Sequence, residues 1–218
     1  MKIFVLNGWA AGEQAWDLCA FPRERIFSYI EQLDGVPEDA LQDEKDIILV
    51  GWSMGGSSAL RLAAKMPEKI RGLVLVAAPA RMMKAPDWPG MTERRLAALE
   101  MGLKMTLSRG EGLSDQRAIN PYIADSDENL SRGLDYLRVV DVRSDLEACR
   151  ASGALNFPVY IFQSERDAVV RRENVGFLEK VFPRAVVSMI PGEEHALPLA
   201  IPSMIDDAVK RIFTASGG

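Results

Sequence analysis

Cysteine and histidine are scarce in this sequence. Its 218 residues include two cysteines, Cys19 and Cys149, and a single histidine, His195. A disulfide framework needs several closely spaced cysteines, and a structural zinc site needs about four Cys or His ligands. The sequence therefore excludes a disulfide-stapled module and predicts no metal site, with both cysteines as buried, reduced thiols.

Long hydrophobic runs and an excess of positive charge are also missing. No stretch approaches the roughly 18–20 apolar residues that cross a bilayer. The apolar run at residues 3–6 is shorter than the ~7–15 residues of a signal-peptide core. Acidic residues outnumber basic ones by 31 to 26, which gives no general attraction to nucleic acid or to an anionic membrane. We expect a cytoplasmic protein.

Short apolar runs rich in valine and isoleucine alternate with helical patterns. Runs without polar alternation are typical of strands buried on both faces of a parallel sheet. They occupy residues 3–6, 47–50, 73–77, 159–162 and 186–190, with a weaker candidate at 25–30. A helical pattern at 57–65, stopped by Pro67, completes a strand–helix–strand unit. The sequence predicts one α/β domain over residues 1–218, with a mostly parallel sheet of about six strands.

The strand signal stops between about residues 80 and 145. Helical patterns take over at 92–107 and 129–140, separated by glycine at 110 and 112 and by Asn120-Pro121. An insertion of this kind in an alternating α/β chain is best interpreted as a helical lid over the sheet.

A G-x-S-x-G motif follows directly after the apolar run at 47–50. The segment 51–56 reads GWSMGG and precedes the predicted helix, which is the strand–turn–helix context of a nucleophile elbow. Such a turn lifts Ser53 out of the sheet, and glycines leave room where a β-carbon would collide with backbone. The helix N-terminus adds partial positive charge beneath the hydroxyl.

A serine hydroxyl needs a base to become a nucleophile, and His195 is the sole histidine. It follows the apolar run at 186–190 in a loop. A carboxylate that fixes the imidazole tautomer is expected between serine and histidine in the chain. Asp167, just after the run at 159–162, is the favoured candidate, and Glu165 is its rival.

An oxyanion hole requires two backbone donors near the serine. The residue after the nucleophile, Met54, supplies one of them. The loop after the first strand begins Asn7-Gly8-Trp9, and Gly8 permits a tight turn, so the amide of Trp9 is the predicted second donor.

With these motifs the chain resembles the α/β-hydrolases, and within them the pimeloyl-acyl-carrier-protein methyl ester esterases of biotin synthesis. Four segments carry the resemblance: 7–9 (NGW), 51–56 (GWSMGG), 87–91 (DWPGM) and 133–143 (GLDYLRVVDVR). The first two are shared widely among α/β-hydrolases, whereas the tryptophan before the serine and the two lid segments are narrower.

The resemblance implies Ser53 as nucleophile, Asp167 as acid, His195 as base, and Trp9 and Met54 as oxyanion donors. Two departures stand out. Asn7 replaces a histidine of the family, and the chain begins at the oxyanion strand, so six strands are expected rather than the family's eight.

The resemblance also implies a carrier-bound acyl ester as substrate and an acidic acyl carrier protein as partner. A lid that receives such a partner should display arginines. The lid offers arginines interleaved with acidic residues, a mixture that a solvated helix explains equally well: Arg94, Arg95, Arg109, Arg117 and Arg132. Five methionines of this region are candidates for an acyl channel, although core packing explains most of them: Met82, Met83, Met91, Met101 and Met105.

The expected chemistry is ester hydrolysis through an acyl-enzyme, which needs no metal or organic cofactor. A broad short-acyl carboxylesterase or thioesterase would use the same residues. A C–C bond hydrolase, a cofactor-free haloperoxidase and a non-catalytic receptor or scaffold are further alternatives, because the fold alone does not fix the reaction.

Overall fold

The computed structural model describes residues 1–108, 122–123, 125–192 and 194–215. Its centre is one six-stranded sheet in the order β2-β1-β3-β4-β5-β6. All neighbouring strands pair in parallel. The strands are β1 (Lys2–Leu6), β2 (Arg25–Phe27), β3 (Ile47–Trp52), β4 (Ile70–Val76), β5 (Val159–Ser164) and β6 (Val186–Ile190). The prediction of a mostly parallel sheet of about six strands is confirmed.

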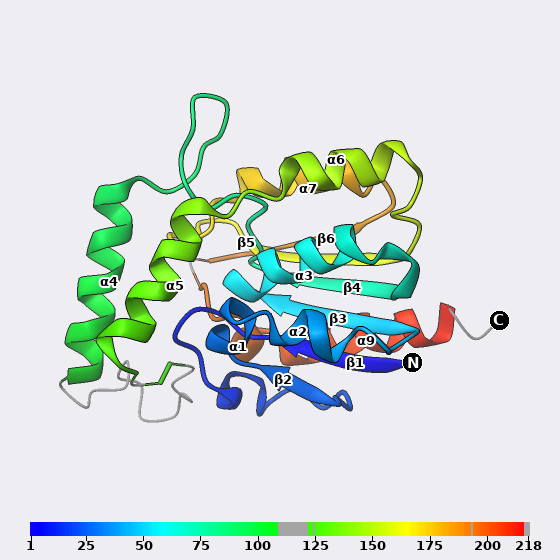
Figure 1. Cartoon of the computed structure of the whole chain (residues 1–218), viewed down its shortest axis with the longest axis horizontal. Coiled ribbons are helices and arrows are strands. Elements are labelled where there is room, and N and C mark those ends of the chain that lie inside the picture. Colours follow the sequence, from blue (N-terminus) through cyan, green and yellow to red (C-terminus); the bar gives the residue numbers. More distant parts are fainter. Residues whose placement is uncertain (109–121, 124, 193, 216–218) are drawn as a thin grey trace.

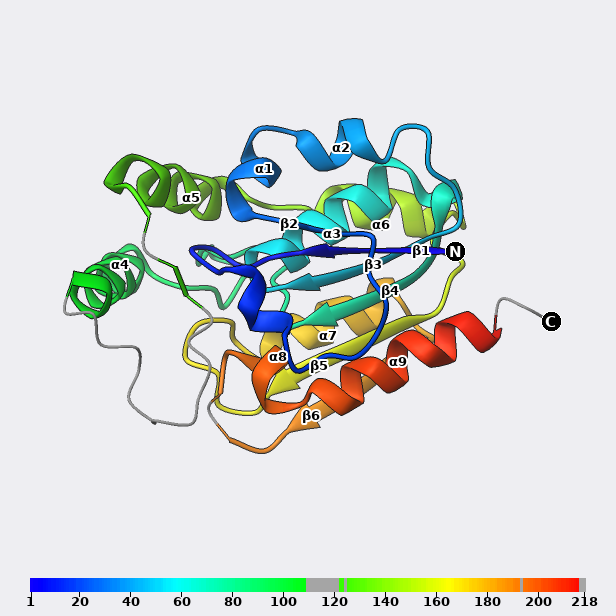
Figure 2. The ribbon, with the colours of Figure 1, turned by 90° about the horizontal axis from the view of Figure 1, so that it is seen from below.

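Helices cover both faces of this sheet. The larger core joins one sheet face to α3, α5, α6 and α7, and the smaller core joins the other face to η1, α8 and α9. Figure 2 shows α3 and α9 on opposite sides of the strands. The helices are η1 (Glu13–Trp16), α1 (Tyr29–Leu33), α2 (Val36–Ala40), α3 (Met54–Lys65), η2 (Pro67–Lys69), α4 (Glu93–Ser108), α5 (Asp127–Val139), α6 (Arg143–Ala151), α7 (Glu173–Val181), α8 (Leu197–Ala200) and α9 (Pro202–Ala215).

The burial of the strands explains why the sequence predicts them. Every residue of β3 is buried, as are four of the five residues of β1. Such strands need apolar side chains on both faces, which removes polar alternation. By contrast, the edge strand β6 has no fully buried residue. Among the described residues, no helix has the length and apolar character to span a membrane.

The weak strand candidate at 25–30 is only half correct, because β2 ends at Phe27 and α1 follows. Ser28 is the N-cap of α1. Its hydroxyl accepts a hydrogen bond from the Glu31 amide, and the Glu31 carboxylate accepts one from the Ser28 amide. This capping box stabilises the start of α1 at the position where a longer strand would continue.

The segment between β4 and β5 places α4 and α5 beyond the carboxyl ends of the strands. In Figure 1 both helices lie on the side of the molecule away from the two termini. They correspond to the helical patterns predicted at 92–107 and 129–140. Ser126 caps α5 by accepting a hydrogen bond from the amide of Asn129, so the helix begins two residues earlier than predicted.

Ion pairs join the two ends of this segment. Arg81 and Asp141 form an antiparallel bridge, and their side chains pair at 2.6 Å. Arg143 binds Asp141 at 2.9 Å and Asp87 at 2.9 Å, and its guanidinium lies 4.9 Å from the centre of the Trp88 ring. The segments 87–91 and 133–143, which carry the family resemblance, therefore meet at the base of α4 and α5.

The hydrogen bonds from Arg143 and then Arg81 hold the pKa of Asp141 at about 2, below its ordinary value of 3.8. The folded state therefore gains stability above pH 4 that it loses as the pH falls from about 4 to 2. We expect Asp141→Asn to lower the free energy of unfolding by about 1–2 kcal/mol at pH 7. Urea denaturation should show this difference shrinking below pH 4.

Asp135→Asn is the matched control, since Asp135 pairs with Arg138 but its side chain is 70% exposed. Its effect should be within about 0.5 kcal/mol at either pH. Equal effects of the two substitutions at pH 7 would contradict a stabilising role for the Asp141 network.

Candidate active site

Ser53 occupies the turn between β3 and α3 in a strained conformation. Its φ of 55° and ψ of −120° lie outside the regions that residues with a β-carbon usually adopt. The turn is held by close packing against glycines. A β-carbon on Gly55 would lie 2.0 Å from the carbonyl oxygen of Leu6, and one on Gly51 would lie 2.5 Å from the carbonyl oxygen of Gly55.

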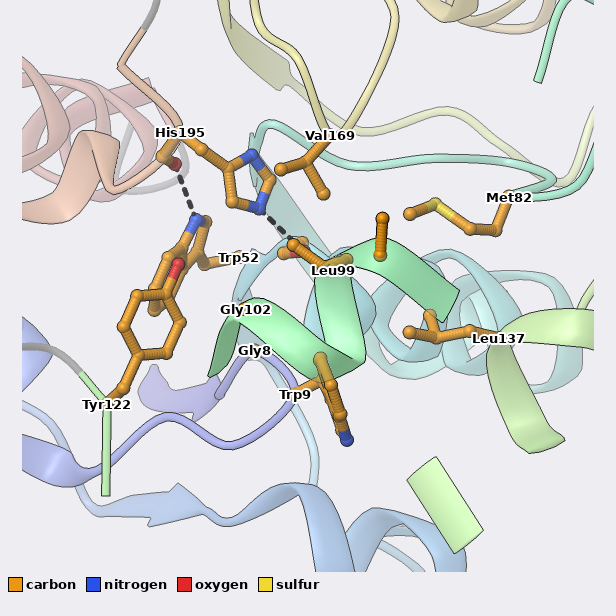
Figure 3. A pocket seen from close by; sticks show the side chains of 12 residues that line it. Gly8, Trp9, Trp52, Met82, Leu99, Gly102, Tyr122, Leu137, Val169 and His195 are labelled. Atoms are coloured by element: carbon orange, nitrogen blue, oxygen red, sulfur yellow. Dashed lines mark hydrogen bonds between the residues drawn. The ribbon is translucent and has the colours of Figure 1, made fainter. Parts of the chain in front are cut away.

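The structure brings Ser53, His195 and Asp167 together in one hydrogen-bonded row. Nε2 of His195 lies 3.0 Å from Oγ of Ser53, and Nδ1 lies 2.8 Å from Oδ2 of Asp167. Because an ionised carboxylate only accepts, Nδ1 carries the proton and Nε2 is free to accept the serine proton. Figure 3 shows His195 at the wall of a cavity, and a dashed line from its ring marks the hydrogen bond to the serine.

Asp167, rather than Glu165, contacts the histidine. Its side chain has no solvent exposure, and Oδ1 accepts hydrogen bonds from the amides of Val169 at 2.7 Å and Val170 at 3.0 Å. These bonds leave Oδ2 directed at His195. Glu165 is exposed. The side chain that sequence reasoning favoured is thus the one that the fold directs inward.

Two further contacts fix the loop that carries His195. The indole Nε1 of Trp52 donates to the carbonyl of His195 at 2.9 Å, and the Ser164 hydroxyl donates to the carbonyl of Glu194. Sequence reasoning missed both partners. The family resemblance singles out the tryptophan before the serine but not its partner, and the position of Ser164 at the end of β5 is the only sequence signal for that residue.

The loop that contains Trp9 lies against Ser53. A β-carbon on Gly8 would lie 3.5 Å from Cβ of Ser53 and 3.2 Å from the Trp52 ring, so the backbone approaches the serine closely. Met54 is the first residue of α3, and first-turn helix amides have no partner within their helix. Both predicted oxyanion donors therefore belong to backbone beside the serine.

Asn7, which departs from the family pattern, organises this loop from inside. Its Nδ2 donates to the carbonyls of Ala11 at 3.1 Å and Gly12 at 2.8 Å. Its Oδ1 accepts from the amide of Gly8 at 3.2 Å and from the indole of Trp16 at 3.1 Å. Asn7 is 1% exposed, so it is a buried polar residue with its hydrogen-bonding capacity used.

A cavity of about 360 Å³ opens beside Ser53 and His195. Figure 3 shows side chains from several elements around it. Apart from these two residues its walls are largely apolar or aromatic: Trp9, Trp52, Met82, Leu99, Tyr122, Leu137 and Val169. Burial, followed by the nearby charges of Glu194 and Asp167, raises the pKa of Tyr122 to about 12, so this phenol is neutral near pH 7.

Of the five methionines considered for an acyl channel, only Met82 borders this cavity. Met83 and Met91 are buried in the larger core. Met101 and Met105 are 65% and 47% exposed on α4, so the channel expectation is wrong for these two. Helix periodicity did not reveal which face of α4 turns toward the sheet.

The described residues contain no group of three or more His, Cys, Asp or Glu side chains that could hold a metal ion. A serine oxygen beside an imidazole that a buried carboxylate orients can attack an electrophilic carbon. The apolar cavity next to it suits an acyl chain.

A family model described as the alpha/beta hydrolase fold matches residues 12–199. The chain is 24% identical over 241 residues to the pimeloyl-[acyl-carrier protein] methyl ester esterase of Yersinia enterocolitica, covering 95% of this chain and 91% of that protein. It is 26% identical over 235 residues to the protein of the same name from Nitrosomonas europaea, covering 92% and 90%.

Solved structures show the same fold. A hydrolase from Oleispira antarctica superposes with a TM-score of 0.70 at 16% identity, covering 98% of this chain and 90% of that chain. A hydrolase from Pseudomonas aeruginosa gives a TM-score of 0.68 at 19% identity, with 97% and 89% covered.

Asn7→Ala tests the support of the loop. The substitution leaves the Trp16 indole and the Gly8 amide without their acceptor, so we expect a loss of about 1–3 kcal/mol in the free energy of unfolding. Urea denaturation measures it. Asn156→Ala, at an exposed position, should change the free energy by less than about 0.5 kcal/mol. Equal stabilities of the two variants would contradict the role of Asn7.

Proposed function

The chain belongs to the α/β-hydrolase fold family and is a hydrolase that acts on esters, and we propose that Ser53, His195 and Asp167 form its catalytic triad. The observation that carries the proposal is their row of hydrogen bonds, 3.0 Å from serine to histidine and 2.8 Å from histidine to aspartate. Ser53 is the nucleophile, His195 the general base and then acid, and Asp167 holds the imidazole tautomer.

The proposed reaction has two halves. Oγ of Ser53 attacks the ester carbonyl carbon while Nε2 of His195 takes the hydroxyl proton, and the carbonyl oxygen becomes an oxyanion facing the amides of Trp9 and Met54. Collapse of this intermediate breaks the bond to the alcohol, which leaves with the proton from His195. Water, deprotonated by His195, then attacks the acyl-enzyme and releases the acid and Ser53.

The proposed substrate is the methyl ester of a pimeloyl chain on an acyl carrier protein, in the biotin synthesis that the family resemblance implies. Two relatives that match over more than nine-tenths of this chain carry that substrate in their names. The cavity supports it, because apolar walls at a volume of about 360 Å³ suit a short acyl chain. Helices α4 and α5 would act as the lid, corresponding to the insertion expected at about 80–145 in a single domain.

Exposed arginines near the cavity support a carrier-protein partner. Arg94 and Arg95 are exposed on α4. Arg95 borders a surface hollow of about 310 Å³ beside Asp167, together with Arg166, Arg171 and Arg172. Glu165 and Glu173 also line this hollow, and Glu173 pairs with Arg171. Arg132 pairs with Asp34, which makes it the weaker candidate, and Arg109 and Arg117 lie outside the described residues.

We also place the protein in the cytoplasm. Cys19 and Cys149 are free thiols, and Cys19 is buried as predicted, whereas Cys149 is only half-buried. Burial raises the pKa of the Cys19 thiol to about 12. Unpaired thiols suit a reducing compartment.

Ser53→Ala tests the nucleophile. We expect hydrolysis of p-nitrophenyl hexanoate to fall by about four orders of magnitude or more, and covalent labelling by a fluorophosphonate to disappear. Circular dichroism should show the fold retained. Labelling or substantial turnover that survives in this variant would place the reaction at another residue.

Substrate preference tests the finer assignment. Release of methanol from pimeloyl-acyl-carrier-protein methyl ester should exceed hydrolysis of p-nitrophenyl acetate or hexanoate in kcat/KM by at least about tenfold. The preference would reflect the extra contacts that the carrier makes. Fast turnover of the small esters alone would instead identify a broad short-acyl carboxylesterase.

Arg94→Glu with Arg95→Glu tests the carrier surface. The double variant should raise KM for the carrier-bound ester by about tenfold, because it reverses two charges facing an acidic partner. Kinetics on p-nitrophenyl hexanoate should stay within about twofold. Unchanged kinetics on the carrier-bound ester would exclude these arginines from docking.

A further inference from the structure

Trp9 connects the site to the segment between β4 and β5 through its side chain. Its backbone is in the loop against Ser53, and the residue is 7% exposed. Nε1 of the indole donates a hydrogen bond of 3.1 Å to the carbonyl of Leu130 in α5. One residue therefore joins the proposed oxyanion loop to a helix more than a hundred positions further along the chain.

Gly133, one turn further along α5, leaves the space that the Trp9 indole occupies. A β-carbon at this position would lie 2.3 Å from Cδ1 and 2.6 Å from Nε1 of Trp9, distances that no packed pair of atoms tolerates. Glycine inside a helix is about 1 kcal/mol less favourable than alanine. This less favourable residue lies at the turn of α5 against which Trp9 packs.

Gly55 and Gly56 in the first turn of α3 are also tightly packed. Two other described glycines inside helices differ from Gly133. A β-carbon on Gly102 in α4 or on Gly176 in α7 would have no neighbour within 4 Å. Glycine at those positions is not required by close packing. The contact of Gly133 with Trp9 is therefore specific to the place where α5 meets the loop.

The same loop is held from outside at two more points. The amide of Ile123 donates to the carbonyl of Ala10 at 2.9 Å, and Ala11 forms an antiparallel bridge with Tyr122. Ala10 itself has a φ of 54°, a conformation that residues with a β-carbon adopt only when their surroundings impose it. The loop conformation thus depends on the segment that packs over it.

We propose that Gly133 is a positioning residue for ester hydrolysis. By admitting the Trp9 indole against α5, it sets the direction of the Trp9 amide toward the oxyanion. The inference rests on the proposed function in one respect, the role of that amide. It adds that the position of α5 and the geometry of the oxyanion hole are coupled through the side chain of Trp9.

Gly133→Ala is the first test. The added methyl group should displace the indole and turn the Trp9 amide away, so kcat for p-nitrophenyl hexanoate should fall by about 10–100-fold, less than the ~10²–10³-fold cost of a deleted oxyanion donor. KM should stay within about twofold, since the acyl cavity loses little. Gly176→Ala adds a methyl group to open space on another helix and should leave both constants unchanged.

A double-variant cycle separates this route from general damage. In a Trp9→Ala background the methyl group at position 133 meets no indole, so adding Gly133→Ala should change kcat by less than about twofold. An undiminished loss of kcat in that background would overturn the proposal. So would a Gly133→Ala protein that is less stable to urea yet retains its kcat.

An indole spectrum provides a readout that does not depend on activity. The chain has four tryptophans, and each gives one indole N–H signal in a ¹⁵N-labelled protein. Trp9→Phe identifies the Trp9 signal by its loss. Gly133→Ala should shift that signal, and the signal of Trp88, whose indole donates to the carbonyl of Arg81 outside this loop, should stay in place. An unmoved Trp9 signal would overturn the inference, whereas a shifted signal in a protein that neither labels with fluorophosphonate nor hydrolyses esters would overturn the proposed function alone.

Discussion

The close approach of α3 to β1 is the constraint on which the site depends. With a β-carbon on residue 55 only 2.0 Å from the Leu6 carbonyl oxygen, glycine is the sole residue that lets the helix begin where it does. That approach presents Ser53 at the carboxyl end of the sheet and brings the loop after β1 beside it. The nucleophile and the proposed oxyanion donors are therefore consequences of one backbone contact.

Much of this arrangement could be predicted from the sequence because it depends on local geometry. The glycines around Ser53 follow from a turn that leaves no room for β-carbons, and buried parallel strands show as apolar runs. Asp167 and its rival Glu165 both follow β5 closely, and a chain that turns out of a strand does not by itself decide between two positions so near to each other. The physical reason for Asp167, the amides of Val169 and Val170 that hold the carboxylate, is visible only in the folded chain.

The cavity walls could not be predicted in the same way. Tyr122, Leu99 and Leu137 become neighbours only through the packing of α4 and α5 against the sheet, and helix patterns specify no such docking. The segments 87–91 and 133–143 carry part of the family resemblance in the sequence. In the structure they meet through Arg143 at the base of this segment, and the second of them also supplies Leu137 to the cavity wall.

The strand order has a consequence for how the chain reaches its working state. Ser53 follows the inner strand β3 and His195 follows the edge strand β6, with β4 and β5 between them, and the two residues are 142 positions apart. Contacts of such long sequence separation form late, because the loop they close costs entropy. A refolding molecule therefore brings His195 to Ser53 only when β6 is in place. The return of activity marks the end of folding rather than its beginning.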